Sequence, residues 1–162
     1  MSPHAEAFRY DILVLGIGNL VWGDDGFGVH AVRELVRRFD VPGTVELMDG
    51  GSQGLYLLPH VQASRRLLLL DAVDCGAGPG ELVVLTDAEV PRFMGAHKVS
   101  MHQSGFQEVL SAAELLGETP ESMTLVGGAE LAIHQFRMAF QRRGSGRHAW
   151  MILTMRWMPC VN

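Results

Sequence analysis

The chain has 162 residues and a mass of 17.8 kDa, which fits one globular domain with a hydrophobic core. Its hydrophobic share of 48% and charged share of 19% argue against intrinsic disorder. The net charge of −5 divides into −9 over residues 1–128 (17 acids, 8 bases) and +4 over residues 129–162 (1 acid, 5 bases), and the acidic body argues against a nucleic-acid-binding protein.

Strands and helices alternate along the chain as far as residue 128. Short apolar runs predict buried strands, and apolar residues spaced three and four apart predict amphipathic helices. In chain order we expect a strand at 12–16, a helix at 26–39, a strand at 44–49, a short helix at 54–62, strands at 65–73 and 81–86, a helix at 102–117 and a strand at 122–127. A loop containing Pro91 is predicted before the last helix, and Gly117 is expected to close that helix as a C-cap.

This alternation predicts a single three-layer α/β/α domain with about five largely parallel strands and helices on both faces of the sheet. Such sheets bind ligands beyond the carboxyl ends of their strands. Of the 19 glycines, 11 follow directly after the first three predicted strands, within 16–28, 50–54 and 76–80. Glycine lets the backbone turn sharply and approach a ligand closely, so we expect the site at this edge. Ordinary turns would explain any one of the three clusters.

The compartment follows from the cysteines and the apolar runs. Two cysteines are too few for a disulfide framework or a structural zinc cluster. The apolar run near the N-terminus lacks the features of a signal peptide, and no run approaches the length of a membrane span. The sequence therefore predicts a soluble cytoplasmic protein that does not contact a membrane.

Three polar residues stand at separate strand–helix junctions of the predicted fold. Asp25 begins a helix, where an aspartate often serves merely as an N-cap. Asp71 follows four leucines, and a buried carboxylate needs hydrogen bonds, a counter-charge or a metal. His102 begins the second long helix, where a lone histidine would count for little. Together, two carboxylates and one imidazole form a half-shell suited to a divalent transition metal such as nickel or zinc.

Other motifs point elsewhere or fail. The glycine-rich segment 16–28 is not a dinucleotide fingerprint, because its third glycine would fall on Val21, and the absence of HExxH excludes a zincin. The segment GGSQG matches G-x-S-x-G, and Ser52, Asp71 and His102 stand in hydrolase order. A serine hydrolase with Ser52 as nucleophile is therefore an alternative, although the usual α/β-hydrolase sheet needs more strands than this length supplies.

The combination of GIGNLVWGDDGFG, VELMDGGSQG, LLLLDAVD, HKVSMHQSGFQEVL and MTLVG, within residues 11–127, resembles the hydrogenase maturation endopeptidases. That family removes a C-terminal extension from the large subunit of nickel–iron hydrogenases. The resemblance implies that Asp25, Asp71 and His102 bind nickel. It also implies that the partner is the large-subunit precursor, that this substrate supplies the nickel, and that the metal serves as the recognition signal.

The nucleophile of the implied peptide-bond hydrolysis is open. A bound metal could polarise the scissile carbonyl or activate a water molecule. An aspartic-type scheme needs two carboxylates that share a proton, and Asp25 and Asp71 are the candidate pair. We expect Asp49, Gly50, Gly51 and Gly54 to shape the loop beside the cleaved peptide. A non-catalytic module that binds the nickel site is a third alternative.

Residues 129–162 form an atypical basic segment after the protease domain of residues 1–128. They hold four of the nine methionines and two of the three tryptophans, with weak helix character at 131–143 and strand character at 149–158. The Gly-x-x-Pro segment and closing amphipathic helix typical of the family are not found there. A shift of reading frame near Gly128 or a divergent terminus would produce this change.

The frame-shift hypothesis predicts that the protein purified from its native source has an intact mass different from 17.8 kDa. Mass spectrometry measures this directly. Agreement with 17.8 kDa would leave the divergent terminus as the explanation.

Overall fold

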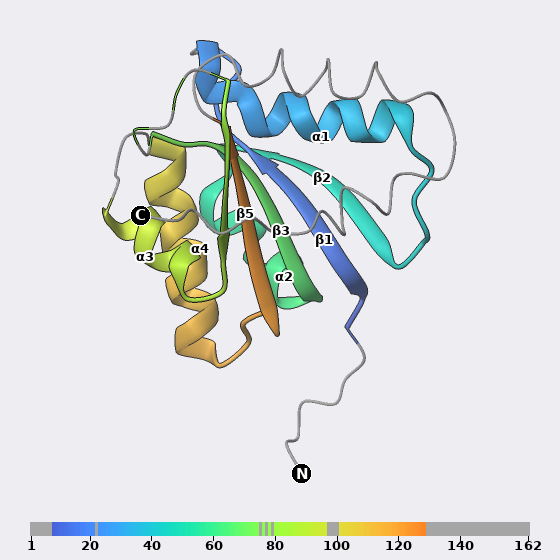
Figure 1. The fold of residues 1–162 in the computed structure, drawn as a ribbon. Helices are drawn as coiled ribbons and strands as arrows, with labels where there is room; N and C mark the ends of the chain where they lie inside the picture. The colour runs from blue at the N-terminus through green and yellow to red at the C-terminus, as the bar shows by residue number, and fades with distance from the viewer. Residues whose placement is uncertain are drawn as a thin grey trace.

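Residues 8–21, 23–74, 76, 78, 80–96 and 101–128 are described by the structure, a computed structural model (Figure 1). Within them, five strands form one sheet in the order β2-β1-β3-β5-β4. The strands are β1 (Tyr10–Ile17), β2 (Val45–Gly51), β3 (Ser64–Ala72), β4 (Leu82–Thr86) and β5 (Ser122–Gly128).

Helices cover both faces of this sheet, which confirms the predicted three-layer α/β/α arrangement. Figure 1 shows α1 on one face and α2, α3 and α4 on the other. No helix in the described part of the chain is both long and apolar enough to cross a bilayer. The helices are α1 (Phe27–Arg38), α2 (Leu58–Gln62), α3 (Glu89–Ala96) and α4 (Met101–Leu116), with 3₁₀ turns η1 (Gly23–Gly26) and η2 (Gly54–Leu57).

The strand directions bring the ends of several strands to one edge. β1 pairs in parallel with β2 and β3, and β3 pairs in parallel with β5. β4 is antiparallel to β5 and forms an edge of the sheet. The prediction of a largely parallel sheet is thus confirmed. The carboxyl ends of β1, β2, β3 and β5 meet at the edge where such folds bind ligands.

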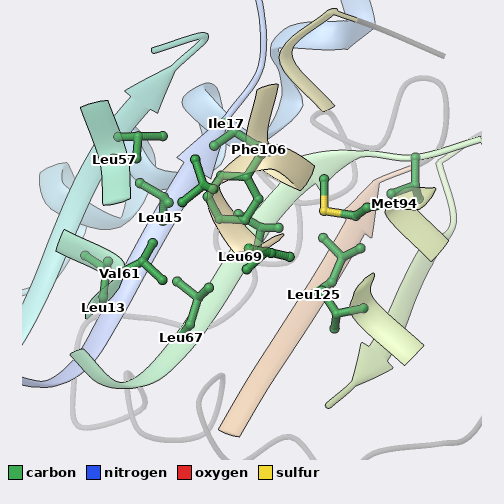
Figure 2. Packing of buried hydrophobic residues seen from close by; sticks show 14 of the residues in the cluster. Leu13, Leu15, Ile17, Leu57, Val61, Leu67, Leu69, Met94, Phe106 and Leu125 are labelled. Atoms are coloured by element: carbon green, nitrogen blue, oxygen red, sulfur yellow. The ribbon is translucent and has the colours of Figure 1, made fainter. Parts of the chain in front are cut away.

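Two apolar clusters hold the layers together. The smaller one joins α1 to the sheet through side chains such as Val14, Val32 and Leu70. The larger one joins α2, α3 and α4 to the opposite face, and Figure 2 shows the ring of Phe106 from α4 in its middle. Side chains of β1 and β3 alternate between the two clusters, because successive residues of a strand point to opposite faces.

One predicted loop is a helix. The segment with Pro91 was expected to be irregular, but α3 spans Glu89–Ala96. Proline is tolerated in the first turn, where the backbone N–H groups have no intrahelical acceptor. The Glu89 carboxylate also accepts a hydrogen bond from the Thr86 N–H (2.9 Å), which anchors the start of the helix. The sequence did not indicate this helix for two reasons. Proline usually interrupts a helix, and the contact that fixes the first turn of α3 is made with Thr86 of β4, which the sequence pattern does not show.

The end of α4 agrees with the prediction for Gly117. Its φ is +70°, and its N–H donates to the Glu114 carbonyl (3.0 Å). The Glu118 N–H donates to the Ala113 carbonyl (2.9 Å), which completes a Schellman-type cap. The predicted helix at 131–143 and strand at 149–158, with the whole segment 129–162, lie outside the described residues.

Glycines allow α1 to begin directly on the sheet backbone. A Cβ on Gly28 would overlap the carbonyl oxygens of Ile17 in β1 and Leu70 in β3. A Cβ on Gly16 would overlap the Gly28 carbonyl in turn. The helix therefore starts against the carboxyl ends of the two central strands, and side chains at either position would push it away.

Gly28→Ala is expected to lower the free energy of unfolding by about 3 kcal/mol, at the upper end of the cost of overpacking. Gly43→Ala is the matched control, because a Cβ on Gly43 has no atom within 4 Å. This control should change the free energy of unfolding by less than about 1 kcal/mol. Urea denaturation of the three proteins measures both effects. Equal stability of the two variants would contradict the close approach at Gly28.

Candidate functional site

Asp71 is a carboxylate buried within the sheet. It stands next to the last residue of β3 and pairs in register with Gly127 of β5, and its exposure is 0%. Burying a carboxylate without compensation is costly, so its surroundings must supply hydrogen bonds or positive charge. Both come from α4, which passes over this end of the sheet.

His102 lies between the two predicted acidic residues and contacts both. Its Nε2 is 2.8 Å from Asp71 Oδ1, and its Nδ1 is 3.2 Å from Asp25 Oδ2. The side chains of His102 and Asp71 are 2% and 1% exposed, whereas that of Asp25 is 25% exposed. The structure thus brings together the three residues that the sequence singled out. Asp25 is the member of this set that solvent reaches.

Asp25 does not have the role of a helix cap. The N-cap position of α1 is Gly26, which has no side chain, and the Asp25 carboxylate faces His102. The backbone of the turn is held by the Asn19 N–H, which donates to the Asp25 carbonyl (3.1 Å). Gly18 has a φ of +142°, and a Cβ there would overlap the same carbonyl. The glycine-rich turn therefore aims Asp25 at α4.

Gln103 is a member of the site to which the sequence analysis gave no role. Its Nε2 donates to Asp71 Oδ2 (3.0 Å) and to the Ala72 carbonyl (2.8 Å). The residue is 4% exposed. The one indication in the sequence that Gln103 belongs to the site is its position directly after His102. Adjacent helical residues point in different directions, so the sequence did not show that both reach one carboxylate.

The electrostatics of the site favour an ion pair. Burial raises the pKa of Asp71, and the hydrogen bonds from His102 and Gln103 offset this in part. Burial lowers the pKa of His102, but the hydrogen bond and charge of Asp71, followed by those of Asp25, outweigh it and raise the pKa. Because both ring nitrogens face carboxylates, a doubly protonated imidazolium suits the arrangement best.

The residues predicted to shape the substrate loop lie at the same edge, but three of them belong to the strand. Asp49, Gly50 and Gly51 are the last three residues of β2, and Gly54 begins η2. The Gly18 N–H donates to the Gly51 carbonyl (3.0 Å), which ties this loop to the turn before Asp25. Gly51 and Gly54 have φ values of +48° and +57°, and a Cβ on Gly105 of α4 would lie 3.5 Å from Gly54 Cα.

The two other residues of this set lie in β2 and are fixed by their neighbours. A Cβ on Gly50 would meet Leu15 Cδ1 at 2.8 Å. Asp49 is paired with Arg33 of α1 at 2.7 Å, and Arg33 is 57% exposed. The loop is thus positioned beside the site, while its contact with a cleaved peptide stays a prediction.

Two predicted chemistries can be compared with this geometry. Ser52 is exposed, and within the described residues no hydrogen bond joins it to His102, whose ring nitrogens face carboxylates. No group of three or more His, Cys, Asp and Glu side chains in the described ranges is arranged to hold a metal ion. Asp25, His102 and Asp71 bond to one another instead, so their role as metal ligands stays a prediction.

The known proteins that this chain resembles in sequence all have names that refer to hydrogenase formation or maturation. A family model described as hydrogenase maturation protease matches residues 29–142. The hydrogenase expression/formation protein HupD of Bradyrhizobium diazoefficiens is 56% identical over 116 residues, which are 72% of this chain and 60% of that protein. The hydrogenase 2 maturation protease of Escherichia coli is 42% identical over 117 residues, which are 72% of this chain and 71% of that protein.

The fold is also similar to a solved structure. The hydrogenase maturating endopeptidase HybD from E. coli superposes with a TM-score of 0.72 at 35% identity, over 81% of this chain and 88% of that one. The chain spans from 55% to 60% of the length of the HupD, HupM and HoxM relatives that it matches.

The ion pair should make stability depend on pH. The hydrogen bond and charge of Asp71, followed by those of Asp25, raise the pKa of His102, so the folded chain holds the imidazolium proton more tightly than the unfolded chain does. The contribution of His102 is present in full below its ordinary pKa of about 6.5 and is lost as the pH rises through the raised value. The free energy of unfolding should therefore fall from pH 6 to pH 9.

The double variant Asp71→Asn/His102→Gln is the reference, because it removes both titrating groups while keeping their approximate shapes. Urea denaturation of both proteins at each pH gives the difference between their free energies of unfolding. That difference should decrease by about 1.4 kcal/mol for each unit by which folding raises the pKa of His102. A difference that grows with pH would contradict the ion pair.

Proposed function

We propose that this chain, which belongs to the hydrogenase maturation protease family, is an endopeptidase that removes the C-terminal extension of the large-subunit precursor of a nickel–iron hydrogenase. The observation that carries the proposal is the meeting of Asp25, His102 and Asp71 at the carboxyl edge of the sheet. This edge is where open α/β sheets bind their ligands. The recognised substrate is the precursor after nickel insertion.

The donor atoms of the site suit the nickel that the precursor carries as cargo. Carboxylate oxygens and an imidazole nitrogen are ligands that divalent nickel accepts. Asp25 is the first of these groups that an incoming precursor can reach, because a quarter of its side chain is exposed. His102 lies behind it and is already held by Asp71. A precursor without nickel offers these side chains no such partner, which makes the metal a recognition signal.

Hydrolysis needs a water molecule, a group that takes its proton, and a group that gives a proton to the leaving nitrogen. The oxygen of the water bonds to the scissile carbonyl carbon, and the bond from that carbon to the amide nitrogen breaks. The nickel ion, when present, would supply polarisation of a carbonyl or a water. Asp25 is the carboxylate placed to take the proton, since Asp71 is buried and contacts His102 instead.

The order of contacts supports different roles for the two carboxylates. A pair that shares one proton directly requires the carboxylates to touch. Here the imidazole of His102 stands between them, 3.2 Å from Asp25 and 2.8 Å from Asp71. We therefore assign Asp71 to orienting His102, much as the buried aspartate of a serine-protease triad orients its histidine. Held in this way, His102 donates a hydrogen bond from Nδ1 to Asp25, and Asp25 takes the proton of the water and gives it to the leaving nitrogen.

The variants Asp25→Asn, Asp71→Asn and His102→Ala are expected to lose processing of nickel-loaded precursor by about 100-fold or more, because general acid–base catalysis contributes about 10²–10⁴-fold. The assay incubates each protein with precursor prepared with and without nickel. Appearance of the shortened large subunit is followed by mass spectrometry. The wild-type chain should process the nickel-loaded form and leave the nickel-free form intact.

Asp40→Asn is the matched control, because Asp40 is exposed and lies beyond the C-terminal end of α1, and it should keep full activity. Full activity in any site variant would remove that residue from the site. Loss of activity in Ser52→Ala would favour the serine hydrolase instead. Nickel-dependent binding of intact precursor without cleavage would favour the non-catalytic module.

A further inference from the structure

The side chain of Gln103 is buried at the site, and only its amide nitrogen, not its amide oxygen, has hydrogen-bond partners among the described residues. Its amide nitrogen donates to Asp71 Oδ2 (3.0 Å) and to the Ala72 carbonyl (2.8 Å). Its Oε1 is buried and accepts no hydrogen bond from the described residues. An unpaired buried acceptor costs the free energy of its lost hydration, and such groups in native proteins call for an explanation.

The neighbours of Gln103 fix which way its amide faces. Asp71 Oδ2 and the Ala72 carbonyl are both acceptors, so the NH₂ group must point toward them. Exchanging the nitrogen and oxygen would place three acceptors together. The unpaired position of Oε1 is therefore a consequence of the need for two donors at Asp71 and Ala72.

With the hydrogen bond from Gln103, α4 contacts both oxygens of the Asp71 carboxylate. His102 Nε2 meets Oδ1 and Gln103 Nε2 meets Oδ2, so two consecutive residues of one helix bind both oxygens of one carboxylate. The second bond of Gln103 ends on the strand backbone at Ala72. Together these bonds set the plane of the carboxylate relative to the end of β3.

We propose that Gln103 is a positioning residue that orients the Asp71 carboxylate so that Oδ1 meets His102. The geometry explains why a polar residue stands where Leu or Met would fill the space without leaving a buried acceptor unpaired. The proposal rests on the proposed function, because it assigns Gln103 to the same hydrolysis through Asp71 and His102.

The main test is Gln103→Met, which keeps the length of the side chain and removes both donors. We expect kcat for processing of nickel-loaded precursor to fall by about 10- to 100-fold, the usual effect of removing a residue that orients a functional side chain. KM should change by less than about twofold, because Gln103 is 4% exposed and its amide contacts Asp71 and Ala72.

A loss of stability must be separated from a loss of orientation. Val109→Ala is the matched control, because Val109 is fully buried on the same helix in the larger apolar cluster. It should lower the melting temperature and leave kcat unchanged at a temperature where both variants are folded. A parallel fall of kcat in Val109→Ala and Gln103→Met would overturn the positioning role.

Gln103→Glu adds a chemical control of similar size. Its carboxylate would present acceptors to Asp71 Oδ2 and the Ala72 carbonyl, so it should push Asp71 away. We expect its kcat to lie below that of Gln103→Met. Wild-type kcat in Gln103→Glu at a pH where the introduced carboxyl group is ionised would overturn the proposal, because the side chain then donates no hydrogen bond to Asp71.

A spectroscopic measurement on the full chain tests the orientation without any activity. The imidazole nitrogen resonances of His102 should shift in Gln103→Met at constant pH and stay in place in Val109→Ala. The side-chain amide protons of Gln103 should exchange more slowly with solvent than those of the exposed Gln53. Unchanged His102 resonances in Gln103→Met would overturn the proposal.

The two readouts separate this inference from the proposed function. Shifted His102 resonances in a chain that does not process the precursor would overturn the protease function and support the orientation of Asp71. Active wild-type chain with unchanged kcat in Gln103→Met would support the protease function and overturn the role of Gln103.

Discussion

The buried carboxylate of Asp71 is the constraint on which the rest of the site depends. A charge at the end of a central strand is costly unless neighbouring groups replace its lost hydration. His102 and Gln103 do so from consecutive positions of α4, and Asp25 meets the other side of the imidazole. The imidazole of His102 thus links the end of β3 to the turn before α1 through two contacts, one with Asp71 and one with Asp25. Removing either partner would leave an unpaired charge in the interior.

The sequence predicted the parts of the fold that depend on local pattern. Apolar runs and helical spacing indicated the order of the main elements and the parallel sheet, because burial on one face or two leaves a clear periodicity. The meeting of Asp25 and Asp71 was also predictable, because the carboxyl ends of parallel strands share one edge. His102 was placed there on the assumption that it too follows a parallel strand. The strand before it, β4, is antiparallel to β5 and ends at the opposite edge, and α3 lies between β4 and α4.

Features that depend on tertiary contacts were not visible in the sequence. The helix over Glu89–Ala96 was masked by Pro91, whose effect depends on its position within the first turn. The place of His102 between the two carboxylates also escaped prediction, since residue order does not tell whether two acids touch or are bridged. Gln103 was missed for a similar reason: its role follows from the angle at which α4 crosses β3.

The contact of Gly28 with the strand carbonyls has a consequence for how the site tolerates change. This junction joins the start of α1 to the ends of β1 and β3 through backbone atoms, so no side-chain rotamer takes part in it. An exchange of one apolar side chain for another of similar volume in the two clusters should therefore leave the spacing between the turn of Asp25 and the end of β3 unchanged. The spacing of the site residues is thus set by contacts between backbone atoms, which an exchange of side chains in the core does not remove.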